Sequence, residues 1–226
     1  MEALLGWILA LNSETAMIDV APAQAQTTPE AVTRGEDLAR RAVDCLIQGE
    51  DSATTAAQLD EYHRGLSLAE QAVAVDAQNA DAQFALAANL GRVTLLESDP
   101  PNPLRLTRAL HALDTALELD PHHPDALAAR GGLYRQMPWW LGRDLHKAVD
   151  YLRQAVQLDP DNIGARIELA LTYRDLGLPN QSIPLLEEAM VIAEKRRRPM
   201  KVVAALRLLS EISPANNYRY QATAPQ

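Results

Sequence analysis

Two adjacent histidines flanked by carboxylates are the residues that most resemble a metal-binding or acid–base site. His122 and His123 lie between Asp120 and Asp125, and imidazole and carboxylate groups are common ligands of transition metals. Adjacent side chains in a turn point in different directions, however, and no HxxxH or CxxC pattern supplies further ligands. The sequence therefore favours a solvated turn here and predicts no metal ion.

The remaining histidines and glycines do not form a catalytic or cofactor-binding pattern. His63, His111 and His146 are isolated, and the sequence contains no GxSxG, Walker-type or GxGxxG motif. Gly131 and Gly132 are adjacent within a predicted helix, where they favour close helix contact rather than phosphate binding. We therefore expect no enzymatic activity and no cofactor.

The composition indicates an all-α protein that does not bind nucleic acid. Of the 226 residues, 47% are hydrophobic but 4% are aromatic, and the abundant alanine favours closely packed helices. Alternating runs of β-branched and aromatic residues, which would indicate strands, are missing. The net charge of −9 argues against nucleic acid and anionic membranes, which attract basic surfaces. We expect the single cysteine, Cys45, to be a small buried residue.

A phrase of 16 residues occurs three times along the chain. It covers residues 72–87, 116–131 and 155–170, and a degenerate fourth copy begins at Ala189. The starting positions differ by 44, 39 and 34 residues, and a period of this size is typical of stacked helical hairpins. Each phrase ends one helix at Asp-Pro or Asp-Ala and opens another on small residues. We therefore expect a helical-hairpin solenoid of about nine helices.

Capping residues mark two of the helix starts. Thr28 and Asn102 each precede a proline, the combination that favours the first turn of a helix. Helical patterns at about 29–49 and 55–75 predict a first hairpin, and residues 201–212 predict a last helix that caps the stack.

The repeated phrase resembles the tetratricopeptide repeat (TPR). The last full unit carries small, large and aromatic residues in the order of the TPR pattern, namely Leu169, Ala170, Tyr173, Gly177, Ser182, Leu186 and Ala189. The resemblance covers about residues 29–212, with the best repeats at about 80–194. It implies a TPR superhelix that binds a partner without catalysis.

Three further segments resemble a narrower group of TPR proteins. Residues 62–65, 87–92 and 138–148 are similar to the TPR-type T component of TRAP transporters and to the regulator-of-microtubule-dynamics-like proteins. Arg143 stands where those relatives usually have a second glycine. This resemblance implies a small-ligand binding accessory of an exported transport system.

The TPR resemblance places a concave groove along the first helices of the units. It implies that the side chains of Phe84, Arg92, Arg135, Ile167 and Leu171 face this groove. Ala88, Gly132 and Leu171 occupy the position where a carboxylate clamp of chaperone-binding TPR proteins has Asn, so we expect no such clamp. We expect a largely apolar groove with arginines at its rim, suited to a protein segment or a small amphipathic ligand.

Trp139 and Trp140 are adjacent in an insertion between two predicted helices. Tryptophan is enriched at binding hot spots because one rigid side chain buries a large area. One indole could instead seal the ends of the adjacent helices, and the sequence leaves both interpretations open.

A basic run, residues 195–198 with Lys201, lies at a predicted helix C-terminus. Cations interact favourably with the helix dipole there, so we expect a solvated helix end, with an anion or partner patch as the alternative.

The chain divides into a leader, a repeat domain and a tail, at residues 1–28, 29–212 and 213–226. Residues 3–11 are apolar and small residues would permit cleavage after Ala23 or Ala25, but the first basic residue is Arg34. We expect a periplasmic or otherwise exported protein, with a cytoplasmic location as the alternative. No apolar run approaches the length of about 20 residues that spans a bilayer.

Two functions follow from the sequence. The first is a non-catalytic adaptor that binds a protein segment in its concave groove. The alternative is the transport accessory that binds a small ligand, and self-association through an exposed repeat edge is a third use of the same fold.

Overall fold

The computed structural model describes residues 28–97, 102–137, 139 and 142–213, and these contain nine helices and no strand. The predicted leader and tail, except Thr28 and Ser213, lie outside the described residues. The helices are α1 (Pro29–Asp51), α2 (Thr55–Val75), α3 (Ala80–Glu97), α4 (Pro103–Leu119), α5 (Pro124–Gln136), α6 (Leu145–Leu158), α7 (Ile163–Asp175), α8 (Pro179–Lys195) and α9 (Pro199–Ile212). None of these helices combines the length and apolarity needed to cross a membrane.

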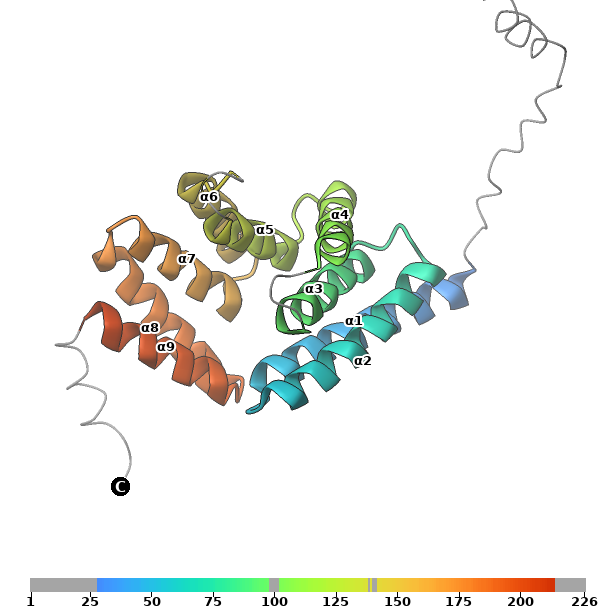
Figure 1. Ribbon diagram of the computed structural model, residues 1–226, viewed down its shortest axis with the longest axis horizontal. Coiled ribbons are helices and arrows are strands. Elements are labelled where there is room, and N and C mark those ends of the chain that lie inside the picture. The colour runs from blue at the N-terminus through green and yellow to red at the C-terminus, as the bar shows by residue number, and fades with distance from the viewer. Residues whose placement is uncertain (1–27, 98–101, 138, 140–141, 214–226) are drawn as a thin grey trace, which may run out of the picture.

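The helices form four antiparallel hairpins followed by a single last helix. Each odd-numbered helix from α1 to α7 packs against the even-numbered helix that follows it, and α1 also contacts α3 as α5 contacts α7. The hairpins follow one another along an arc, with α1 and α2 at one end and α8 and α9 at the other (Figure 1). This arrangement confirms the predicted helical-hairpin solenoid.

The repeated phrase forms the same turn at three junctions. Asp76, Asp120 and Asp159 each accept a hydrogen bond on Oδ1 from the backbone N–H two residues later, at 2.9–3.0 Å. Three residues after each aspartate, a side chain accepts a hydrogen bond from the next helix; these N-caps are Asn79, His123 and Asn162. The predicted caps at Thr28 and Asn102 are also present. Local hydrogen bonds therefore fix where each hairpin ends and the next begins.

Small residues set the distance between the paired helices. The alanine that opens each repeated phrase is fully buried, at Ala72, Ala116 and Ala155, and so is Ala189 of the degenerate copy. A Cβ atom on Gly131 would lie 2.5 Å from Cγ of Leu152. Gly131 therefore permits close contact between α5 and α6, as its sequence position indicates.

The two ends of the solenoid contact each other through a cluster of charges that is largely, but not fully, shielded from solvent. The carboxylate of Glu50, near the end of α1, lies 3.1 Å from Arg198 Nη2 and 3.0 Å from Lys201 Nζ at the start of α9. Arg92 of α3 reaches the same carboxylate at 2.9 Å, and Arg198 also pairs with Asp51. The loop end of the α1–α2 hairpin consequently meets the junction of α8 and α9, which closes the arc (Figure 1).

This contact corrects the expectation of a solvated basic run for Arg198 and Lys201, whereas Lys195, Arg196 and Arg197 are exposed as expected. The side chains of Arg198 and Lys201 are largely buried against α1, and Arg196 pairs with Asp161 Oδ2 at 3.0 Å. Because the acidic partners of Arg198 lie about 150 residues earlier in the chain, the local helix-end argument could not find them.

The buried alanines predict a sensitivity to added volume. Ala155 packs with Leu127 and Ala165 at a fully buried position, so Ala155→Leu should lower the free energy of unfolding by roughly 1–3 kcal/mol. Urea unfolding followed by circular dichroism measures this change. Gln157→Leu, an exposed position on the same helix, is the control and should change stability by less than about 0.5 kcal/mol. Equal effects of the two variants would show that the register of the repeat is wrong.

The charge cluster at Glu50 predicts a pH-dependent contribution to stability. Burial by itself would raise the pKa of Glu50, but Lys201, Arg92 and Arg198 together lower it. Because the folded-state pKa lies below the unfolded value of about 4.3, the contribution is present above that pH and is lost as the pH falls through the folded-state pKa. Glu50→Gln should therefore cost about 3 kcal/mol at pH 7, and its difference from wild type should shrink on acidification.

Urea unfolding of wild type and Glu50→Gln at neutral and acidic pH tests this expectation. The matched control is Glu211→Gln, which removes the exposed pairs of Glu211 with Arg207, 3.1 Å away, and with Arg174, 3.8 Å away. These surface pairs should each contribute less than about 1 kcal/mol. A Glu50→Gln effect as small as the control would show that the contact between the ends of the solenoid adds nothing to stability.

Candidate functional site

A cleft of about 1120 Å³ lies along α1 and is completed by the N-terminal ends of α3 and α5. Its walls carry more acidic than basic side chains. Six carboxylates and two arginines line it, namely Glu30, Glu36, Asp37, Asp44, Asp81 and Asp125, with Arg34 and Arg40. Val43 and Phe84 supply an apolar floor. The cleft is therefore an acidic site with a small apolar base.

His123 connects two walls of this cleft and is 6% exposed. Its Nδ1 accepts the hydrogen bond from Ala126 N–H at 3.3 Å, so the neutral ring carries its proton on Nε2. That nitrogen lies 3.1 Å from Oδ1 of Asp81, but outside the geometry of a hydrogen bond. The ring also packs against Phe84, with the centroids 5.0 Å apart. The expectation of a solvated turn holds for the exposed His122 and is wrong for His123.

Two carboxylates beside His123 differ in their protonation behaviour. The polar contact with His123 lowers the pKa of Asp81, against a smaller opposing effect of burial. Burial raises the pKa of Asp125, although its Oδ1 accepts a 2.7 Å hydrogen bond from Nδ2 of Asn162. Within the described ranges, no three His, Cys, Asp or Glu side chains are grouped so as to hold a metal ion. The arrangement suits the binding of a cation by charge and hydrogen bonding.

The residues that the TPR resemblance assigns to the groove are divided between separate environments. Phe84 is buried in the core and contributes only to the floor of the cleft. Arg92 is paired with Glu50, and Arg135 contacts Glu168 at 2.9 Å and Asp175 at 3.6 Å. Both arginines therefore have carboxylate partners, and the surface near them is more polar than the sequence suggested.

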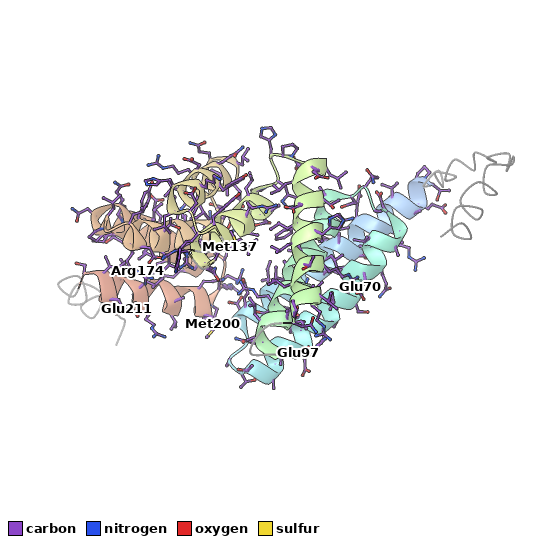
Figure 2. The ribbon with its side chains drawn as sticks, turned by 45° about the horizontal axis from the view of Figure 1, so that its top comes forward. Glu70, Glu97, Met137, Arg174, Met200 and Glu211 are labelled. Atoms are coloured by element: carbon purple, nitrogen blue, oxygen red, sulfur yellow. The ribbon has the colours of Figure 1, made fainter. Side chains whose placement is uncertain are left out.

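The other predicted groove residues lie further along the chain. Ile167 is partly buried against the clusters formed by α7, α8 and α9, and Leu171 is half-buried on α7. At the C-terminal end of the solenoid, Nη1 of Arg174 on α7 lies 3.8 Å from Oε2 of Glu211 on α9; both residues are labelled in Figure 2. Trp139 is 83% exposed in the turn between α5 and α6, and Trp140 lies outside the described residues.

Sequence reasoning missed the burial of His123 and the role of Glu50. Alignment of the repeated phrases could have predicted that His123 caps a helix, because it occupies the same position as the capping residues Asn79 and Asn162. Glu50 has no comparable signal because its partners belong to other helices.

Comparison with known proteins supports one repeat directly and the fold as a whole. The tetratricopeptide repeat family matches residues 142–162. The chain is 36% identical over 92 residues to sperm-associated antigen 1 of Mus musculus, a match that covers 40% of this chain and 10% of the mouse protein. The matched segment thus spans about a tenth of that relative.

Two solved structures share the arrangement of helices. The structure of pilF from Pseudomonas aeruginosa has a TM-score of 0.52 at 19% identity, covering 80% of this chain and 70% of that one. A thermophilic TPR protein of Thermus thermophilus has a TM-score of 0.50 at 18% identity, covering 83% and 97% of the two chains. Identities this low establish the fold alone. Together with the family match, they show that the described part of this chain is a helical solenoid with the fold of tetratricopeptide-repeat proteins.

Proposed function

We propose that this chain is a non-catalytic adaptor that binds a segment of a partner protein on the inner face of its solenoid. The cleft along α1, with α3 and α5, is the observation that carries this proposal. Its volume of about 1120 Å³ is close to the upper end of the range of about 300–1,000 Å³ that is usual for small-molecule pockets. The cleft also follows α1 from Pro29 to Asp44, a length of about 22 Å that suits several residues of an extended protein segment better than a small ligand.

The frame of the cleft also suits binding. Three separate helices supply its walls, and each is held by capping hydrogen bonds and by buried contacts with its hairpin partner. Groups held on a rigid frame lose little entropy on binding. The one histidine among the described lining residues already serves as a helix cap, which favours a binding role over an acid–base role.

The transport-accessory alternative depends on the narrower resemblance in the sequence. None of the relatives reported above is a transport accessory, so they lend it no support. We therefore keep the proposal that the chain binds a segment of a protein. The expected export of the chain remains a prediction from residues 1–28.

Site-specific photo-crosslinking tests the adaptor function. A photoreactive phenylalanine analogue replaces Thr33, which lines the cleft, or Gln71, an exposed residue of α2 that does not line it. The Thr33 variant should capture one defined protein from native extract, and that protein, once purified, should bind the full chain with 1:1 stoichiometry in calorimetry. Capture at Gln71 alone, or equal capture at both positions, would contradict binding in the cleft. Crosslinks to a second copy of the chain would indicate self-association instead.

The exposed Trp139 gives a second test once that partner is in hand. Because Trp139 is 83% exposed, Trp139→Ala should leave the melting temperature unchanged, and a hot spot at this turn predicts a loss of about 2 kcal/mol in binding free energy. Trp140→Ala is measured in parallel. Leu104→Ala, which truncates another highly exposed apolar side chain at the start of α4, is the control. A lower melting temperature with intact binding would show that the tryptophan pair is structural.

A further inference from the structure

The cleft carries a surplus of negative charge that the protein itself does not neutralise. Asp37 is paired with Arg40 and Arg41 on α1. Glu36 and Asp44, by contrast, have no cationic partner within 4 Å among the described residues, although both side chains line the cleft. A concave surface lined by one sign of charge concentrates ligands of the opposite sign. This favours a cationic ligand.

His123 adds a polar group that points to a peptide rather than to a simple cation. Its Nε2 is buried and has no hydrogen-bond partner of acceptable geometry, which is unusual for a buried polar atom. Since Nδ1 is engaged as the helix cap, Nε2 carries a hydrogen and needs an acceptor. The neighbouring Asp81 carboxylate, whose Oδ1 lies 3.1 Å from Nε2, is 73% exposed, and we expect a bound segment to displace it. A backbone carbonyl of a bound segment would satisfy this donor, whereas an inorganic cation or a polyamine would not.

The floor of the cleft matches the long side chains of lysine and arginine. Val43 and the ring of Phe84 line the cleft together with the carboxylates of Asp81 and Asp125. Lysine and arginine bury their aliphatic stems on apolar surface while the charged group remains among polar partners. An apolar floor with acidic walls therefore accommodates a basic side chain more completely than a neutral one.

The acidic residues of α1 extend along the cleft for several residues of a bound chain. Glu30, Asp37 and Asp44 recur at intervals of seven and so lie on one face of the helix. At 1.5 Å per residue this stripe is about 21 Å long, which an extended chain of about six residues would follow.

We infer that the cleft binds an extended, basic segment of the partner protein, with lysine or arginine side chains at the acidic walls and a backbone carbonyl at His123. This inference rests on the proposed adaptor function and names the chemistry of the segment that the adaptor recognises.

The test uses a fluorescein-labelled peptide of about eight residues with a repeating Lys-Ser-Thr sequence, titrated with the full chain in fluorescence anisotropy. The peptide should bind, its affinity should fall as salt rises, and the counterpart with Glu in place of Lys should not bind. Absence of binding by the lysine peptide, or equal binding by both peptides, would overturn the inference. Displacement of the lysine peptide by spermine, at the same total concentration of positive charge, would also overturn the inference, because the cleft would then bind any polycation.

Two double variants with the same change in net charge separate a specific site from general attraction. Glu36→Lys with Asp44→Lys reverses charge in the cleft, and Glu118→Lys with Asp150→Lys reverses charge at exposed residues that do not line it. The cleft variant should weaken the lysine peptide by about tenfold or more, and the outer variant by no more than about twofold. Equal losses in the two variants would overturn the inference.

His123→Asn tests the backbone contact without removing the cap. Asparagine occupies the equivalent position of the phrase at Asn79 and Asn162 and makes the same capping hydrogen bond there. At Asn162 the second amide atom, Nδ2, is bonded to Asp125, the equivalent of Asp81, so we expect asparagine at position 123 to offer no donor to a bound segment. The variant should melt at a lower temperature, because it loses the ring packed against Phe84. Where it is fully folded, it should bind the lysine peptide about three- to tenfold more weakly, the loss expected for one hydrogen bond. Unchanged affinity would remove the contact on which the assignment of a peptide depends.

The crosslinking experiment distinguishes this inference from the proposed function. A partner captured at Thr33 whose bound segment is acidic or apolar would overturn the inference and leave the adaptor function standing. Failure of the cleft to capture any partner would overturn both.

Discussion

The contact of paired helices at alanine and glycine positions is the constraint on which the rest of this structure depends. Fully buried alanines such as Ala116 and Ala155 recur once per hairpin, and Gly131 leaves no space for a Cβ atom beside Leu152. Helices that approach this closely bury most of their shared surface with few aromatic residues, which agrees with a chain that is 4% aromatic. Each hairpin is thereby a thin, rigid unit, and the stacking of such units produces the curved inner face.

The repeated turn converts this stack of hairpins into a site. At three junctions an aspartate ends one helix and a side chain three residues later caps the next. Two of these caps also contact the preceding hairpin: Nδ2 of Asn162 donates to Asp125, and Nε2 of His123 lies 3.1 Å from Asp81, the equivalent aspartate. At His123 this structural position of the repeat also lines the cleft.

Closure of the arc determines how much of the inner face is open. Repeat solenoids hold together mainly through contacts between neighbouring units, yet here Glu50 of the first helix pairs with Arg198, which immediately precedes the last helix, and with Lys201 in its first turn. The same cluster includes Arg92 of α3, so one part of the predicted groove is filled by the protein's own ion pairs. The acidic cleft, which lies nearer the N-terminal end of α1, keeps carboxylates without cationic partners among the residues that the structure describes.

The helices, their caps and the repeat were predictable from the sequence, because they depend on residues within one or two turns of each other. Ala155 at a helix contact and the caps at Thr28 and Asn102 are examples. The folded chain alone reveals that Arg198 is buried against the first helix and that acidic side chains of three helices share one cleft. The distance between Glu50 and Arg198 is set by the summed curvature of all the hairpins between them, and no local pattern encodes that sum.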